Sequence, residues 1–295
     1  MTDGDNLRAR RERAVTDEVL ASFSDAESPR LKELMAALVE HLHAFAREVR
    51  LTETEWDLAI NYLTEAGQIS TDRRQEFILL SDVLGLSMLT VGINAPAVHG
   101  ATESTVFGPF FMQGSPQIER GGNIAEGVKG QPCYIHGVVR DVDGAPVPSA
   151  RIEVWEADDD GFYDVQYEGD KVQGRGHLFS GPDGEYDFWC VLPAPYPIPH
   201  DGPVGRLLAA SNRSPMRPAH VHFMVTAPGY SSLITHIFVE GSDHLDGDAV
   251  FGVKPSLIIE FKERVGFPAP GAHVDGPWVE AEFDIVLSRS GESSR

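Results

Sequence analysis

The segment HVHFMVTAPGYSSLITHIFVEG, residues 220–241, is typical of two β-strands joined by the turn APGY. Its first strand has a period of two, which gives one face with Val221, Phe223 and Val225 and another with His220, His222 and Met224. Side chains two residues apart in a strand point the same way, roughly 6.5–7 Å apart, so two imidazoles at this spacing can hold one metal ion. A pair of buried, hydrogen-bonded histidines is the simpler alternative, and the rest of the chain must decide.

The chain before residue 100 has a helical period instead. Ser28 and Pro29 are typical of the start of a helix, and Thr52 with Glu55 forms a capping-box pattern at the next. The first of these helices carries an apolar stripe made of Leu31, Leu34, Met35, Leu38, Leu42 and Phe45. A third helix is predicted at about 72–90.

From about residue 130 short apolar runs alternate with Gly, Pro and Asp, which favours an antiparallel β-sandwich. Predicted strands lie in CYIHGVVR, ARIEVWEA, EYDFWCVLP and the two runs of residues 220–241. The fold class is therefore α+β. We expect a helical dimerisation domain, residues 1–105, followed by a β-sandwich catalytic domain, residues 106–295.

Composition limits the classes of function. The formal net charge of -21 argues against a nucleic-acid or anionic-membrane partner. Two cysteines are too few for a secreted disulfide framework, and the charged N-terminus lacks the apolar core of a signal peptide, so we expect a cytoplasmic protein. The most apolar window, residues 77–98, contains polar residues and a proline and is predicted to be buried helix.

A second His-x-His pair, His41 and His43, lies in a predicted helix. Two residues rotate a helix by about 200°, so these side chains cannot chelate one ion. Only His220 and His222 remain as a pair. The motifs of a cupin, of a zinc protease and of an EF-hand are each incomplete in this chain.

Two tyrosines have positions suited to ligands. Tyr163 ends VWEADDDGFYD directly after a predicted strand, and Tyr196 lies between two prolines in LPAPYPIP. Prolines on both sides restrict the backbone, so this loop can present Tyr196 rigidly. Each tyrosine alone could equally be a half-buried packing residue.

VWEADDDGFYD, LPAPYPIP and RPAHVHFMVTAPGY, in this order, resemble the intradiol ring-cleaving dioxygenases, and STVFGPFF (104–111) is most similar to their hydroxyquinol-cleaving branch. The resemblance spans nearly the whole chain. It implies one Fe(III) per chain bound by Tyr163, Tyr196, His220 and His222, with hydroxide as a fifth ligand. Two phenolates and two neutral imidazoles suit a hard trivalent iron.

The resemblance also implies roles in catalysis. Tyr163 is the permanent phenolate, whereas Tyr196 leaves the iron and accepts a substrate proton. Arg217 is expected to stabilise the electron-rich ring, although a pairing with a surface carboxylate is the alternative. O2 and a catechol-type diol or triol would then give a muconate-type diacid.

The substrate pocket implied by the branch has ten residues: Leu79, Asp82, Val106, Phe107, Gly108, Pro109, Phe110, Ile198, Pro199 and Val250. Asp82 is the informative one, because its carboxylate can accept a hydrogen bond from a third ring hydroxyl that catechol lacks. A solvated Asp82, with catechol or chlorocatechol as substrate, is the near alternative.

The resemblance further implies a homodimer formed through the helical region, with a lipid bound between the subunits. A different class stays open as well. The sandwich could be a non-catalytic binding module, in which case Tyr163 and Tyr196 are packing residues.

Overall fold

The computed structural model describes residues 3–95, 98–169, 172–271, 274 and 276–291. The chain divides into two compact units, Met1–Thr64 and Glu65–Arg295, each described by itself below. The outer limits of the expected domains, residues 1 and 295, and residues 96–97 of the apolar window lie outside the described residues.

The first unit is helical. It contains α1 (Asp3–Ser22), α2 (Pro29–Glu48) and most of α3 (Glu53–Ile69). Both predicted caps are confirmed: Ser28 accepts the backbone N–H of Leu31, and Thr52 and Glu55 bond reciprocally. Five residues of the α2 stripe are about half exposed: Leu31, Leu34, Leu38, Leu42 and Phe45.

The single helix predicted at 72–90 is wrong, because the structure has two helices there. α4 (Glu76–Val83) and α5 (Leu86–Asn94) are separated by Gly85 at φ 74°, a left-handed conformation that ends one helix before the next begins. No single helix of the described residues is long and apolar enough to cross a membrane; α4 and α5 pass that test only together and are bent by 77°. A further helix, α6 (Pro203–Ala210), was not predicted.

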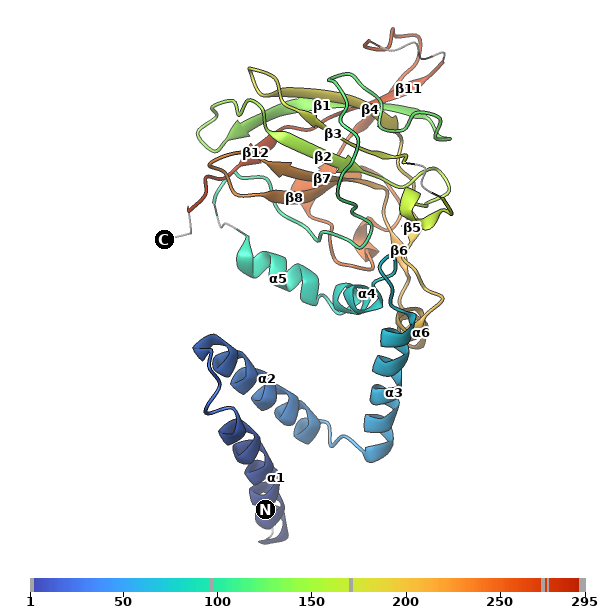
Figure 1. Cartoon of the computed structure of the whole chain (residues 1–295). Helices are drawn as coiled ribbons and strands as arrows, with labels where there is room; N and C mark the ends of the chain where they lie inside the picture. The colour runs from blue at the N-terminus through green and yellow to red at the C-terminus, as the bar shows by residue number, and fades with distance from the viewer. Residues whose placement is uncertain (1–2, 96–97, 170–171, 272–273, 275, 292–295) are drawn as a thin grey trace. The chain divides into compact units, whose positions relative to one another are not determined.

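The second unit is built on two sheets, which Figure 1 shows as two layers of strands. One sheet contains β1 (Pro132–Asp141), β4 (Glu185–Val191), β10 (Phe261–Arg264), β11 (Trp278–Glu282) and β12 (Ile285–Leu287). The other contains β2 (Arg151–Trp155), β3 (Arg175–Phe179), β7 (His220–Thr226), β8 (Leu233–Val239) and β9 (Ile258–Ile259). A small pair joins β5 (Tyr196–Pro197) to β6 (Met216–Arg217), and the 3₁₀ turns are η1 (Asp164–Gln166), η2 (Leu245–Gly247) and η3 (Pro255–Leu257).

The core lies between the two sheets, as expected of a sandwich. Ile135 and Phe188 from one sheet pack in the same cluster as Val221, Phe223 and Val225 from the other, and all five are fully buried. The predicted apolar face of residues 220–226 is therefore confirmed, and so is the α+β class. The sheets are mixed rather than purely antiparallel, because β1 pairs in parallel with β11 and β12, and β8 with β9.

Candidate metal centre and substrate pocket

The second face of β7 carries the two histidines. His220 and His222 are 2% and 1% exposed, and their Nε2 atoms lie 3.2 Å apart. Met224, next on this face, packs against a separate aromatic cluster that includes Tyr163 and Tyr196. The period of two therefore delivers both imidazoles to one place, as the sequence predicts.

Tyr163 reaches the same place from the loop before η1, and Tyr196 reaches it from the short strand β5. The hydroxyl of Tyr163 lies 3.0 Å from that of Tyr196 and 2.8 Å from Nε2 of His222, and both hydroxyls lie 3.4 Å from Nε2 of His220. We call these four side chains the donor cluster. Donors at such separations fit around one ion about 2 Å from each of them.

Local backbone features fix the two tyrosines. Tyr163 donates its backbone N–H to Gln166 Oε1 at 2.9 Å, in the turn that opens η1. Gly161 has φ 82°, and a Cβ at this position would come within 2.7 Å of the Cβ of Tyr196. Only glycine therefore lets the Tyr163 loop pass this close to Tyr196.

The two imidazoles are oriented in different ways. His220 donates from Nδ1 to the carbonyl oxygen of Pro218 at 2.7 Å, which leaves the Nε2 lone pair facing the cluster. His222 has no hydrogen-bond partner at Nδ1 among the described residues. Its ring is instead stacked on Trp155, with centroids 4.7 Å apart and planes at 17°.

Burial controls the protonation of the cluster. Desolvation raises the pKa of Tyr163 well above its ordinary value, the neighbouring Tyr196 adds to this, and desolvation also raises the pKa of Tyr196. Desolvation, with Arg217, lowers the pKa of His220 to about 3. The imidazoles are thus neutral and can each offer a lone pair to a metal ion. The phenols need a nearby cation to become phenolates, and a highly charged metal ion would supply it.

Arg217 is 3% exposed and pairs with the buried Asp248, not with a surface carboxylate. Its Nε and Nη2 donate to the two carboxylate oxygens at 3.0 and 3.3 Å, which leaves Nη1 at 3.0 Å from Nε2 of His220. Desolvation alone raises the pKa of Asp248, but Arg217 reverses this and holds it below its ordinary value. A fixed positive charge therefore lies beside the donor cluster.

Nine of the ten expected pocket residues fall into three groups. Leu79, Val106, Ile198 and Val250 share one buried apolar cluster. Phe107, Gly108 and Phe110 contact residues around the donor cluster: Phe107 packs on Trp155, a Cβ on Gly108 would lie 3.2 Å from the His222 ring, and Phe110 stacks on Tyr163 at 4.6 Å. A cavity of about 590 Å³ is lined in part by Leu79, Pro109, Phe110, Ile198 and Pro199.

Asp82, the tenth residue, is 2% exposed on α4 and is therefore not a solvated helix residue. Burial raises its pKa to about 6, while a hydrogen bond from Ser87 and the charge of Arg217 act in the opposite direction. The charge of Asp248 raises this pKa further, so both members of the Arg217–Asp248 pair influence the Asp82 carboxyl.

The chain is similar to known proteins along most of its length. Residues 28–102 match the family model of the catechol dioxygenase N terminus, and residues 106–289 match the dioxygenase model. The chain belongs to the intradiol dioxygenases. It is 62% identical to hydroxyquinol 1,2-dioxygenase of Nocardioides simplex over 94% of this chain and 96% of that one. The solved hydroxyquinol 1,2-dioxygenase of Pseudomonas putida DLL-E4 superposes with a TM-score of 0.88 at 43% identity, over 95% of this chain and 99% of that one.

A more distant solved relative has the same fold. Catechol 1,2-dioxygenase of Acinetobacter radioresistens superposes with a TM-score of 0.85 at 26% identity, over 97% of this chain and 96% of that one. The helical and sandwich parts of this intradiol dioxygenase are therefore both found in its relatives.

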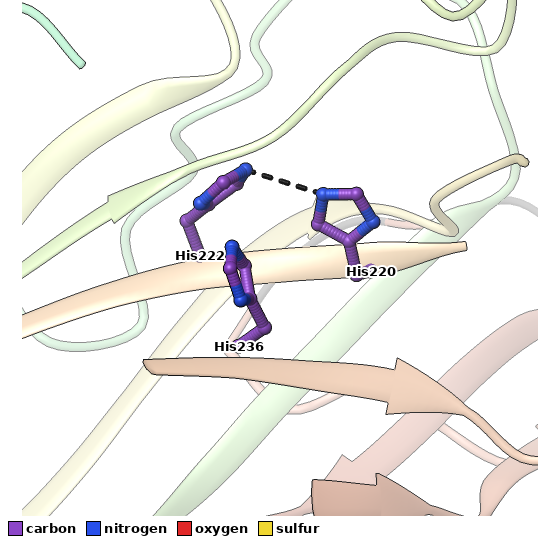
Figure 2. A group of neighbouring side chains, drawn as sticks. All are labelled: His220, His222 and His236. Atoms are coloured by element: carbon purple, nitrogen blue, oxygen red, sulfur yellow. Dashed lines mark hydrogen bonds between the residues drawn. The ribbon is translucent and has the colours of Figure 1, made fainter. Parts of the chain in front are cut away.

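Sequence reasoning missed three residues of this dioxygenase's site. Asp248 lies in a segment without a recognisable motif, whereas Trp155 lies within VWEADDDGFYD but was not singled out there. His236 could have been found, because in a hairpin of residues 220–226 and 233–239 it lies directly opposite His222. Figure 2 shows His236 on the neighbouring strand, with its ring beside those of His220 and His222.

Proposed function

We propose that this intradiol dioxygenase cleaves hydroxyquinol, 1,2,4-trihydroxybenzene, between its two adjacent hydroxyl-bearing carbons. Both atoms of O2 enter the product, a hydroxymuconate in tautomeric relation with maleylacetate. The observation that carries the proposal is the buried convergence of two phenol oxygens and two imidazole nitrogens, 2.8–3.4 Å apart in the contacts given above. Relatives named hydroxyquinol 1,2-dioxygenase, 54–62% identical, support the choice of substrate.

We infer that Tyr163, Tyr196, His220 and His222 hold one Fe(III) per chain. The donor set fits such an ion, since phenolate oxygens prefer hard, highly charged metals and the imidazoles are already neutral. When bound, ferric iron withdraws electron density from a chelated ortho-diolate, which makes a ring carbon reactive toward O2. The other roles in the reaction are carried out by residues of the chain.

Tyr196 and Arg217 supply proton and charge control in this proposal. With the metal bound, the Tyr196 phenolate would be the base that accepts a proton from a substrate hydroxyl, and Tyr163 would remain the permanent ligand. The Nη1 of Arg217 now hydrogen-bonds to Nε2 of His220. With Nε2 of His220 bound to a metal ion, this N–H would be free to donate to the bound substrate, whose negative charge it would stabilise.

The expected pocket residues select the ring. Leu79, Val106, Ile198 and Val250 form an apolar wall, and Phe107, Gly108, Pro109, Phe110 and Pro199 continue it toward the donor cluster. Asp82 is the acidic group proposed to recognise the third hydroxyl. A wall without such an acceptor would serve catechol or chlorocatechol equally well.

We also propose that residues 1–105 form the dimerisation domain and residues 106–295 the catalytic domain of a cytoplasmic homodimer. The stripe of α2 supports this proposal, since it exposes five large apolar side chains on one helix and such a face is usually covered by a partner. A lipid between the subunits is part of the same proposal.

Purified protein tests the function directly. We expect a red solution, because tyrosinates bound to ferric iron absorb visible light, and one iron per chain. With hydroxyquinol under ¹⁸O2 both labelled atoms should appear in the ring-opened product, whereas catechol should react more slowly. A colourless, iron-free protein would instead support the binding-module alternative, and a preference for catechol would move the enzyme to the neighbouring branch.

A further inference from the structure

His236 lies at the donor cluster but makes no contact that the proposed function uses. It is on β8, directly opposite His222 in the antiparallel pair with β7, and is fully buried. Its ring centroid is 4.1 Å from that of His222 and 5.0 Å from that of His220 (Figure 2). One atom each from His220, His222 and His236 lies within 4.8 Å of the other two.

One side of the His236 ring is anchored. Its Nδ1 is hydrogen-bonded to Oγ1 of Thr105, which is itself 1% exposed. The backbone N–H of Thr105 donates to the carbonyl oxygen of Ile234 at 2.9 Å, so the threonine is tied to the same strand as the histidine. This arrangement fixes the ring plane and therefore the direction of Nε2.

The other side of the ring is unsatisfied. Nε2 of His236 is buried and has no hydrogen-bond partner among the described residues. An imidazole nitrogen in this state costs free energy unless a partner arrives. Phe238, which packs beside the ring at 5.6 Å, offers no polar atom.

We propose that Nε2 of His236 hydrogen-bonds to an oxygen atom that occupies the metal site from outside the protein: a water molecule in the resting enzyme or an oxygen of the bound aromatic substrate. The inference rests on the proposed iron site. Thr105 directly precedes Val106 and Phe107 of the proposed pocket wall, so one short segment holds both the histidine and the wall. His236 is not assigned as a ligand, because no donor-cluster atom forms a hydrogen-bonding contact with its Nε2.

Four variants separate the possibilities. His236→Phe keeps a ring but removes both nitrogens, His236→Gln retains a side-chain amide nitrogen, and Thr105→Val removes the anchor. Thr235→Val is the matched control, because Thr235 is an equally buried threonine beside His236 whose hydroxyl donates to Glu103 O. Each protein is assayed for iron per chain, for its visible spectrum from pH 6 to pH 9, and for the Kd of hydroxyquinol without O2.

We expect all variants to retain iron. If the partner is a substrate oxygen, His236→Phe should raise the Kd about tenfold, His236→Gln should stay within about threefold of wild type, and Thr105→Val should fall between them. If the partner is water, the pH dependence of the substrate-free spectrum should change instead of the Kd. It should differ from that of the wild type most in His236→Phe, less in Thr105→Val and least in His236→Gln. Thr235→Val should match wild type in both readouts.

Two results would overturn the inference. In the first, His236→Phe and Thr105→Val bind hydroxyquinol and absorb light like Thr235→Val, which would leave His236 as packing only. In the second, both His236 variants lose iron, which would make it a metal ligand. An iron-free wild type would be a failure of the proposed function itself and is recognised before any variant is compared.

Discussion

Tyr196 pairs directly with Arg217 across the two-residue strands β5 and β6. The backbone N–H of Ile198 continues this pairing by donating to Pro215 O at 2.9 Å. The proposed departing ligand and the charge beside it are thus fixed by one short backbone ladder. A shift of either residue along the chain would separate them.

Replacing each tyrosine by phenylalanine should give two different results. Tyr163→Phe should lose both iron and the visible absorption, because it removes the permanent phenolate. Tyr196→Phe should retain more iron but lose turnover, because the proton acceptor is gone. Iron per chain, the visible spectrum and kcat measure these effects.

Tyr134→Phe is the control for this pair. Tyr134 lies on β1, in the other sheet from His220 and His222, and donates its hydroxyl to Asp187 at 3.1 Å. It should keep iron, colour and kcat. Full activity in both Tyr163→Phe and Tyr196→Phe would contradict the assigned site.

Asp248→Asn should destabilise the fold and weaken catalysis together. The change leaves the buried guanidinium of Arg217 without a charged partner, which should lower the free energy of unfolding by roughly 3 kcal/mol. The side chain of Arg217 would also lose its fixed direction, so kcat/KM should fall. Urea unfolding and steady-state kinetics measure both, with the exposed Asp246→Asn in the same loop as control. Equal behaviour of the two variants would mean that Asp248 does not position Arg217.

The fold could be predicted where a period or a cap is local. The alternation at residues 220–226 and the caps at Ser28 and Thr52 depend on near neighbours, and all three are confirmed. The break at Gly85 was missed because a lone glycine in an apolar run does not show its φ, and the parallel pairing of β1 depends on strands more than a hundred residues away.

In the candidate site, too, contacts between residues near in sequence could be predicted, and contacts between distant residues could not. His220 and His222 are two residues apart, so the spacing alone indicated that they act together. The pairing of Arg217 with Asp248 spans 31 residues, and that of Thr105 with His236 spans 131. No local pattern records such contacts, which come from the packing of loops on the finished sandwich.

The stripe of α2 should be an interface between two copies of the chain. Leu38→Glu together with Leu42→Glu puts two charges on a half-exposed apolar face, so it should convert a dimer into monomers at micromolar concentration. Sedimentation velocity measures this, with Glu40→Gln on the same helix as control. A wild type that sediments as a monomer would exclude the proposed dimer.

The discrimination between hydroxyquinol and catechol should depend on pH. Burial raises the pKa of Asp82 to about 6, so the carboxylate that accepts a hydrogen bond becomes the major form only above this pH. The ratio of kcat/KM for hydroxyquinol to that for catechol should therefore rise between about pH 5 and about pH 7.

The contribution of Asp82 to the free energy of unfolding should change in the opposite sense with pH. Because the folded pKa lies above the ordinary value of 3.8, the contribution of Asp82 is present below that value and is lost as the pH rises through about 6.

Asp82→Asn should remove the discrimination itself. If the carboxylate accepts a hydrogen bond from the third hydroxyl, the variant should lose about 2 kcal/mol of transition-state stabilisation for hydroxyquinol, and its kcat/KM should fall accordingly. This is the scale of a lost hydrogen bond to a charged group. Catechol has no hydroxyl at this position, so it gains nothing from the carboxylate and its kcat/KM should barely change. The pH dependence of the ratio should disappear in the same variant. Steady-state kinetics of both proteins on both substrates under air test this, and an equal loss on the two substrates would mean that Asp82 supports the pocket in general.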